Sequence, residues 1–168
     1  MLINFSCSNN SQNNTGTSTT AQKKRLDTAD IRLANDLSGF FTSQVQAAQL
    51  VQARGSGKKV KELAKQNEQL YTQMGNYLNN LSEEYQVKLP AQLSPTTDKN
   101  LAELKAIKTA RIDHAYLLQM LKDHNITIRE TNAAKNVECV PLKTFVVSNQ
   151  SAIIKQAYAL SALKDITP

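Results

Sequence analysis

The chain has 168 residues and a mass of 18.6 kDa, enough for one domain with a buried core and some polar chain outside it. Its residues are 40% hydrophobic and 5% aromatic, with five glycines and four prolines, which argues against a turn-rich β-sandwich or barrel. The net charge is +6, but beyond one basic cluster at 23–25 the acidic and basic residues are interspersed, which argues against a nucleic-acid surface.

The first 26 residues differ in composition from the rest. Residues 8–22 are almost wholly Ser, Thr, Asn and Gln, and such a segment cannot bury enough apolar surface to offset the entropy lost on ordering. The sequence therefore predicts a disordered, lipoprotein-like polar tail at 1–26 and a folded domain at 27–168.

Cys7 is the candidate lipidation site in this tail. It follows a small residue, Ser6, and precedes the polar segment, an arrangement that resembles a bacterial lipoprotein processing site. Only six residues precede it, too few for a signal peptide, and Asn4 stands where an aliphatic residue is usual. Either the natural start lies upstream of Met1, or Cys7 is an ordinary tail residue of a cytoplasmic protein.

A lipid on Cys7 would be the protein's contact with a membrane. No apolar run in the sequence approaches the roughly 18 residues that a membrane-spanning helix needs. With the lipid, the domain would lie in the periplasm or be anchored at the outer membrane of a bacterium.

The first part of the domain predicts an antiparallel helix pair. Asp27 or Thr28 can cap a helix that extends to the Gly55–Gly57 break, and its apolar residues recur at spacings of three and four. A second helix with the same spacing extends from about Lys58 to Tyr85. The short loop between the two helices makes them antiparallel neighbours.

The rest of the domain predicts two further helices. A connection at 86–97 contains two prolines and carries the chain either along or across the bundle. The third helix begins at Thr97 or Asp98 and is long enough to bend near Thr109, and the fourth spans about Val140–Leu163. Four apolar-striped helices predict an all-α, antiparallel four-helix bundle.

Polar residues interrupt the apolar stripes and are the candidate functional residues. Heights measured from the hairpin turns place Gln44 level with Tyr71 and His124 level with Asn149, with Asp123 beside them. A buried amide or imidazole without a partner costs about 1–3 kcal/mol, so we expect these level residues to pair in a polar layer. The layer fixes helix register, or it forms a small polar-ligand pocket. The candidates are Gln44, Tyr71, Asp123, His124, Asn149 and Gln156.

The sequence contains no recognisable catalytic motif, metal site or cofactor site. Ferritin-like di-iron sites need two Glu-x-x-His units, and none occurs here. His114 and His124 are about 15 Å apart along a helix and cannot share an ion. No Gly-x-Ser-x-Gly elbow or phosphate loop is present. These features favour a non-enzymatic protein that binds a protein partner or a small polar ligand.

Three segments resemble a bacterial family of unknown function. Residues 112–124, IDHAYLLQMLKDH, resemble its characteristic third-helix motif, and residues 60–70 and 142–160 match its second and fourth helices in spacing. The family is number 4142 among domains of unknown function, is labelled an outer-membrane protein and is classed as ferritin-like. The resemblance covers about residues 36–163 and implies a ferritin-like bundle.

The resemblance also implies that the metal-site positions have changed. Where the family has Glu in the first helix, this chain has Gln44 and Gln46. Where the family has His in the second and fourth helices, it has Tyr71 and Gln156. The alternative to a binding role is therefore a metal-binding or redox bundle that keeps only a remnant of the metal site, around His124.

Overall fold

The structure is a computed structural model that describes residues 26–132, 134 and 137–167. Residues 1–25 of the predicted tail, including Cys7, lie outside the described residues, whereas its last residue, Leu26, is buried in the core. The described part contains five α-helices and no strand, so the prediction of an all-α protein is confirmed. The helices are α1 (Thr28–Arg54), α2 (Lys58–Glu84), α3 (Pro95–Ala106), α4 (Thr109–Asn132) and α5 (Val140–Lys164).

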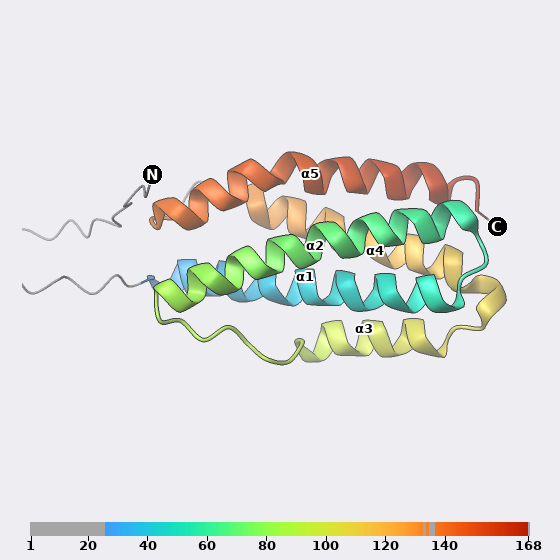
Figure 1. Cartoon of the computed structure of the whole chain (residues 1–168), viewed down its shortest axis with the longest axis horizontal. Coiled ribbons are helices and arrows are strands. Elements are labelled where there is room, and N and C mark those ends of the chain that lie inside the picture. The colour runs from blue at the N-terminus through green and yellow to red at the C-terminus, as the bar shows by residue number, and fades with distance from the viewer. Residues whose placement is uncertain (1–25, 133, 135–136, 168) are drawn as a thin grey trace, which may run out of the picture.

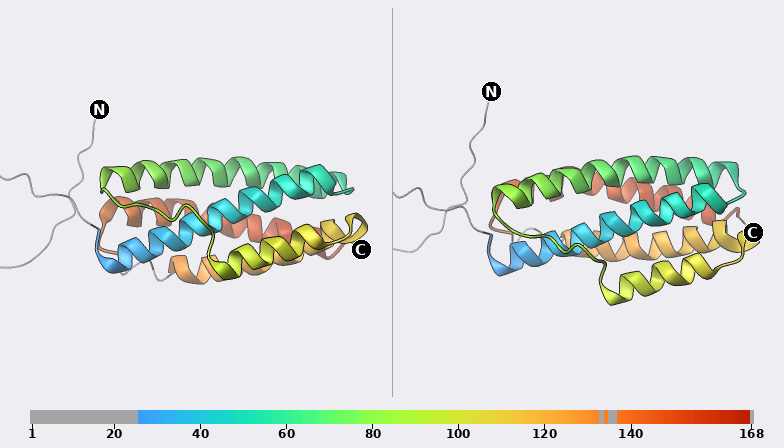
Figure 2. Two further views of the ribbon diagram at one scale, coloured as in Figure 1. Left: turned by 90° about the horizontal axis from the view of Figure 1, so that it is seen from below. Right: turned by 60° about the horizontal axis from the view of Figure 1, so that its bottom comes forward.

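The four long helices lie side by side along one axis, as Figure 1 shows. Helices α1 and α5 point one way, and α2 and α4 point the other. The short α3 lies on the outside of the bundle, packed against α1 and α4 (Figure 2). The connection that follows α2 lies on the outside of the bundle, and so does α3, so this part of the chain runs along the outside.

The expected third helix is in fact two helices, α3 and α4. The described residues therefore form five helices, and the predicted number of four was wrong. Ile107 adopts an extended backbone (φ −64°, ψ 137°) and ends α3. Arg54 at the end of α1 stabilises this break, because its guanidinium donates to the carbonyl oxygens of Lys105 and Ile107, both at 2.6 Å. At the other end, Ser94 caps α3 by accepting from the Thr97 amide at 3.2 Å.

A carboxylate from α4 caps the start of α2. The N-cap residue of α2, Gly57, offers no side chain, and the first turn of α2 has no acidic residue. Asp113 supplies the missing acceptor: its Oδ2 accepts from the backbone N–H groups of Ser56 (3.0 Å) and Gly57 (2.6 Å). A negative charge at a helix N-terminus also interacts favourably with the helix dipole.

The buried apolar residues divide into two clusters along the bundle. One cluster lies toward the start of α1 and includes Phe41, Leu78 and Phe145. The other lies toward the α1–α2 turn and includes Val51 and Leu160. The candidate site lies where these two clusters meet.

Candidate functional site

Each of the four long helices carries a polar residue between the two apolar clusters. These residues, which we call the polar layer, are Gln44 on α1, Asn67 on α2, His124 on α4 and Gln156 on α5. The first three are 0% exposed, and Gln156 is partly buried. The bundle therefore has a polar cross-section where its core would otherwise be continuous.

His124 in this layer is neutral, and its hydrogen bonds fix where its proton lies. Nδ1 lies 2.7 Å from the Met120 carbonyl oxygen, which can only accept, so Nδ1 carries the hydrogen. Nε2 then accepts from the Tyr71 hydroxyl at 2.6 Å. Burial lowers the pKa of His124 to about 4 and raises the pKa of Tyr71, which keeps the imidazole neutral and the phenol protonated.

A second buried hydrogen bond also joins α2 to α4. The Asn67 amide donates to the Tyr116 hydroxyl at 3.1 Å, and burial raises the pKa of Tyr116. Helices α2 and α4 lie diagonally across the bundle rather than packing side by side. The two hydrogen bonds therefore pass through the interior of the bundle.

The observed partners differ from the expected pairs, Gln44 with Tyr71 and His124 with Asn149. Tyr71 pairs with His124. Asn149 donates to the Phe145 carbonyl of its own helix at 2.8 Å and lies at a surface hollow beside Tyr77. Neither polar atom of the Gln44 side chain has a partner in the described residues. Height along a helix does not say which helices face each other, and this is why the expected pairing was wrong.

The donors in the polar layer do not fit the iron site that a ferritin-like fold implies. Such a site needs several carboxylates, whereas the layer offers three amides and one imidazole, with the phenols of Tyr71 and Tyr116 hydrogen-bonded to it. Both ring nitrogens of His124 are engaged by Tyr71 and Met120. Within the described residues, no group of three or more His, Cys, Asp and Glu side chains is placed to hold an ion.

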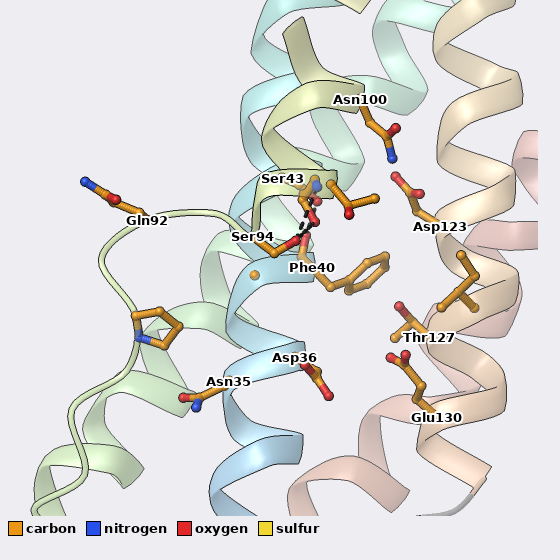
Figure 3. Close-up of a pocket in the computed structure, with 15 residues that line it drawn as sticks. Asn35, Asp36, Phe40, Ser43, Gln92, Ser94, Asn100, Asp123, Thr127 and Glu130 are labelled. Carbon is orange, nitrogen blue, oxygen red and sulfur yellow. Dashed lines mark hydrogen bonds between the residues drawn. The ribbon is translucent and has the colours of Figure 1, made fainter. Parts of the chain in front are cut away.

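A groove of about 420 Å³ opens on the surface beside the polar layer. Its walls come from α1, from α4, from the connection that follows α2 and from the first part of α3 (Figure 3). Phe40 of α1 forms part of the wall, and its ring also contacts His124 and Tyr71 edge-on, with centroid distances of 5.3 and 5.2 Å. One aromatic ring therefore separates the groove from the polar layer.

The groove is acidic although the chain carries a net charge of +6. Among the described residues that line it are Asp36, Asp123 and Glu130, but no Lys or Arg. Burial raises the pKa of Asp123 and, together with the charge of Asp36, the pKa of Glu130. Arg32 lies 3.8 Å from Asp36, but this pair is largely exposed and therefore weak.

Two polar side chains in the groove lack hydrogen-bond partners. Thr127 is 3% exposed, points into the groove in Figure 3, and its hydroxyl makes no hydrogen bond within the described part of the chain. The Oδ1 atom of Asn35 is buried and has no partner there either. Leaving a buried group such as the Asn35 oxygen unpaired costs about 1–3 kcal/mol, so the groove suits a ligand that can form hydrogen bonds.

The groove changes the role of one predicted residue and adds others. Asp123 was expected to flank the polar layer, but it lies in the groove, where Gln119 donates to its Oδ1 at 2.8 Å. Thr127 and Glu130 were missed, although they follow Asp123 at positions i+4 and i+7 and so share one helix face. Asp36 comes from another helix, and the sequence gives no sign that it joins them.

The comparisons with known proteins find a matching family and one similar fold. A family model described as "Domain of unknown function (DUF4142)" matches residues 15–163. The crystal structure of a DUF305 fragment from Deinococcus radiodurans is similar, with a TM-score of 0.67 over 82% of this chain and 99% of that chain. Its sequence identity of 13% means that the similarity concerns the fold alone. No curated protein sequence matches this chain.

Proposed function

The chain belongs to this DUF4142 family. We propose that it is a non-enzymatic, lipid-anchored protein of the bacterial cell envelope that binds a cationic ligand. A ferritin-like bundle serves as the scaffold, and the groove beside Phe40 is the binding site. The observation that carries this proposal is the set of three carboxylates that line the groove. No Lys or Arg is among the described residues that line it.

The pKa shifts in the groove support a positive ligand. A partly buried carboxylate loses solvation, and its pKa rises when nearby cations compensate for only part of the loss. Asp123 and Glu130 both show this rise, although Lys122 acts on Asp123, and Arg32 and Arg129 act on Glu130, in the opposite direction. A bound cation would supply the missing compensation, and partial burial would make the attraction stronger than that of an exposed ion pair.

The non-enzymatic part of the proposal rests on the chemistry of the buried polar groups. Amides such as Gln44 and Gln156 neither accept nor release protons near neutral pH. His124 engages both ring nitrogens in hydrogen bonds. A metal-binding or redox role around His124, the alternative from the sequence, would first require one of these bonds to break.

The charge preference of the groove can be tested with three compounds of equal length. Hexane-1,6-diamine is expected to bind, whereas hexane-1,6-diol and adipate are not. Replacing both Asp123→Asn and Glu130→Gln should weaken diamine binding at least about tenfold, or about 1.4 kcal/mol, measured by titration calorimetry. The variant Asp98→Asn with Glu62→Gln removes the same charge from exposed positions outside the groove and should bind like the parent. Equal binding of all three compounds would contradict the proposal.

The membrane anchor is a separate part of the proposal. None of the helices in the described part of the chain is long and apolar enough to cross a membrane. We assign the anchor to a lipid on Cys7, because this residue follows the small Ser6 and precedes the polar segment 8–22. Together with that polar tail, the lipid would hold the domain at the membrane surface.

Metabolic labelling can test the anchor. When the natural gene is expressed in a bacterium fed a clickable fatty acid, the protein should become labelled, and Cys7→Ser should abolish the label. Cys139 is buried at the start of α5 and remains in both proteins, which makes it an internal control for nonspecific thiol labelling. Label that persists in Cys7→Ser, or is absent from both proteins, would refute the assignment.

A further inference from the structure

The two carboxylates that α4 contributes to the groove are far apart. Asp123 and Glu130 are separated by seven residues, or roughly 10 Å along the helix axis. Both line the groove, and Figure 3 shows them on the same face of α4. A single compact cation cannot contact both, because a Ca²⁺ ion binds its oxygen ligands at about 2.3–2.6 Å.

The surface between the two carboxylates is mainly apolar. Ile126 and Thr127 lie between them on α4 and also line the groove. Across the groove, the ring of Phe40 points from α1 toward this part of α4 (Figure 3). A ligand that reached both carboxylates would therefore place its middle against apolar groups, with the Thr127 hydroxyl as one polar contact.

The two ends of the groove differ in charge. At one end, Asp36 of α1 faces Glu130 of α4 (Figure 3), and the negative charge of Asp36 acts on Glu130. Arg32 and Arg129 act on Glu130 in the opposite direction, but neither lines the groove, and the Arg32–Asp36 pair is largely exposed. At the other end, Asp123 lines the groove together with the neutral amide of Asn100. One end thus offers two carboxylates, and the other offers one carboxylate beside a neutral amide.

From this arrangement we propose that the ligand is a linear polyamine, an extended chain with an ammonium group near each end and methylenes between. The inference rests on the proposed function of the groove as a cation site and specifies its ligand class. One ammonium group binds between Asp36 and Glu130, and the other binds Asp123. The methylenes lie along Phe40 and Ile126.

A series of α,ω-diamines tests the inference on the full-length chain. With C–C bonds of about 1.5 Å, roughly eight methylenes place two amines about 10 Å apart. Titration calorimetry from propane- to dodecane-diamine, with spermidine alongside, should show an affinity maximum near that length, about tenfold above the shortest diamine. In Asp123→Asn, where one anchor is lost, the affinity should no longer depend on length. Asp98→Asn should keep the maximum.

The possible outcomes separate this inference from the proposed function. Cation binding without dependence on length would overturn the polyamine assignment and leave the cation site standing. Tighter binding of Ca²⁺, or of a lysine-containing peptide, than of any diamine would also overturn it. Binding of no cation would overturn both. Circular dichroism of each variant confirms that lost affinity is not lost folding.

Discussion

The substitution Gly55→Ala is expected to destabilise the protein by about 2–6 kcal/mol. A Cβ atom at this position would collide with Oδ1 of Asp113 and lie 2.6 Å from the Val51 carbonyl oxygen. Overpacking costs about 1–3 kcal/mol, and displacing Asp113 would also weaken its hydrogen bonds to Ser56 and Gly57, at about 1–3 kcal/mol. Urea denaturation followed by circular dichroism measures the loss.

A second glycine provides the matched control. A Cβ at Gly75 within α2 would lie 3.9 Å from Phe41, an ordinary contact. Gly75→Ala should therefore stabilise the protein by roughly 0.5–1 kcal/mol, because glycine is unfavourable inside a helix. If Asp113 causes the collision, Gly55→Ala combined with Asp113→Ala should cost less than the sum of the single changes. Additive losses would show that the collision with Asp113 is not the cause.

Acid is expected to destabilise the protein through His124. Its folded pKa is about 4, below the ordinary value of 6.5, so the folded state takes up this proton less readily than the unfolded state. The stability that His124 contributes is fully present above pH 6.5 and is lost as the pH falls from about 6.5 through about 4. The full loss in the free energy of unfolding amounts to about 3 kcal/mol.

The contribution of His124 can be isolated with a variant whose polar layer cannot take up a proton. His124→Leu with Tyr71→Phe removes the imidazole without leaving a buried hydroxyl unpaired. Urea denaturation between pH 7.5 and 4 should show a steeper loss of stability in the parent. The raised pKa values of Asp30, Asp123 and Glu130 act in the opposite sense, because these groups gain protons readily in the folded state. They occur in both proteins, so parallel pH curves would contradict the prediction.

The helical character of the domain could be predicted from sequence because it depends on local spacing. Apolar residues at intervals of three and four mark each long helix. The length of the third segment predicted a bend near Thr109, but not a complete break between α3 and α4, because Arg54 at the far end of α1 supplies the hydrogen bonds that stabilise it. A contact between residues about 50 positions apart leaves no local pattern.

The candidate site could be predicted only in part, for a similar reason. Tyr71 and His124 stand out as polar residues on apolar stripes, and the structure buries both. Their partnership depends on α2 and α4 lying diagonally across the bundle, which spacing within one helix does not reveal. The groove forms because Asp36 of α1 lies opposite the acidic residues of α4. Only the fold shows that these carboxylates come together.

The Asp113 cap has a consequence for how the domain folds. The start of α2 is completed by a residue 56 positions later in the chain, so the α1–α2 hairpin lacks its cap until α4 has docked. Hairpin formation and α4 docking are therefore energetically coupled. Native-state hydrogen exchange should accordingly find the first turn of α2 and the first turns of α4 opening together, as one cooperative unit.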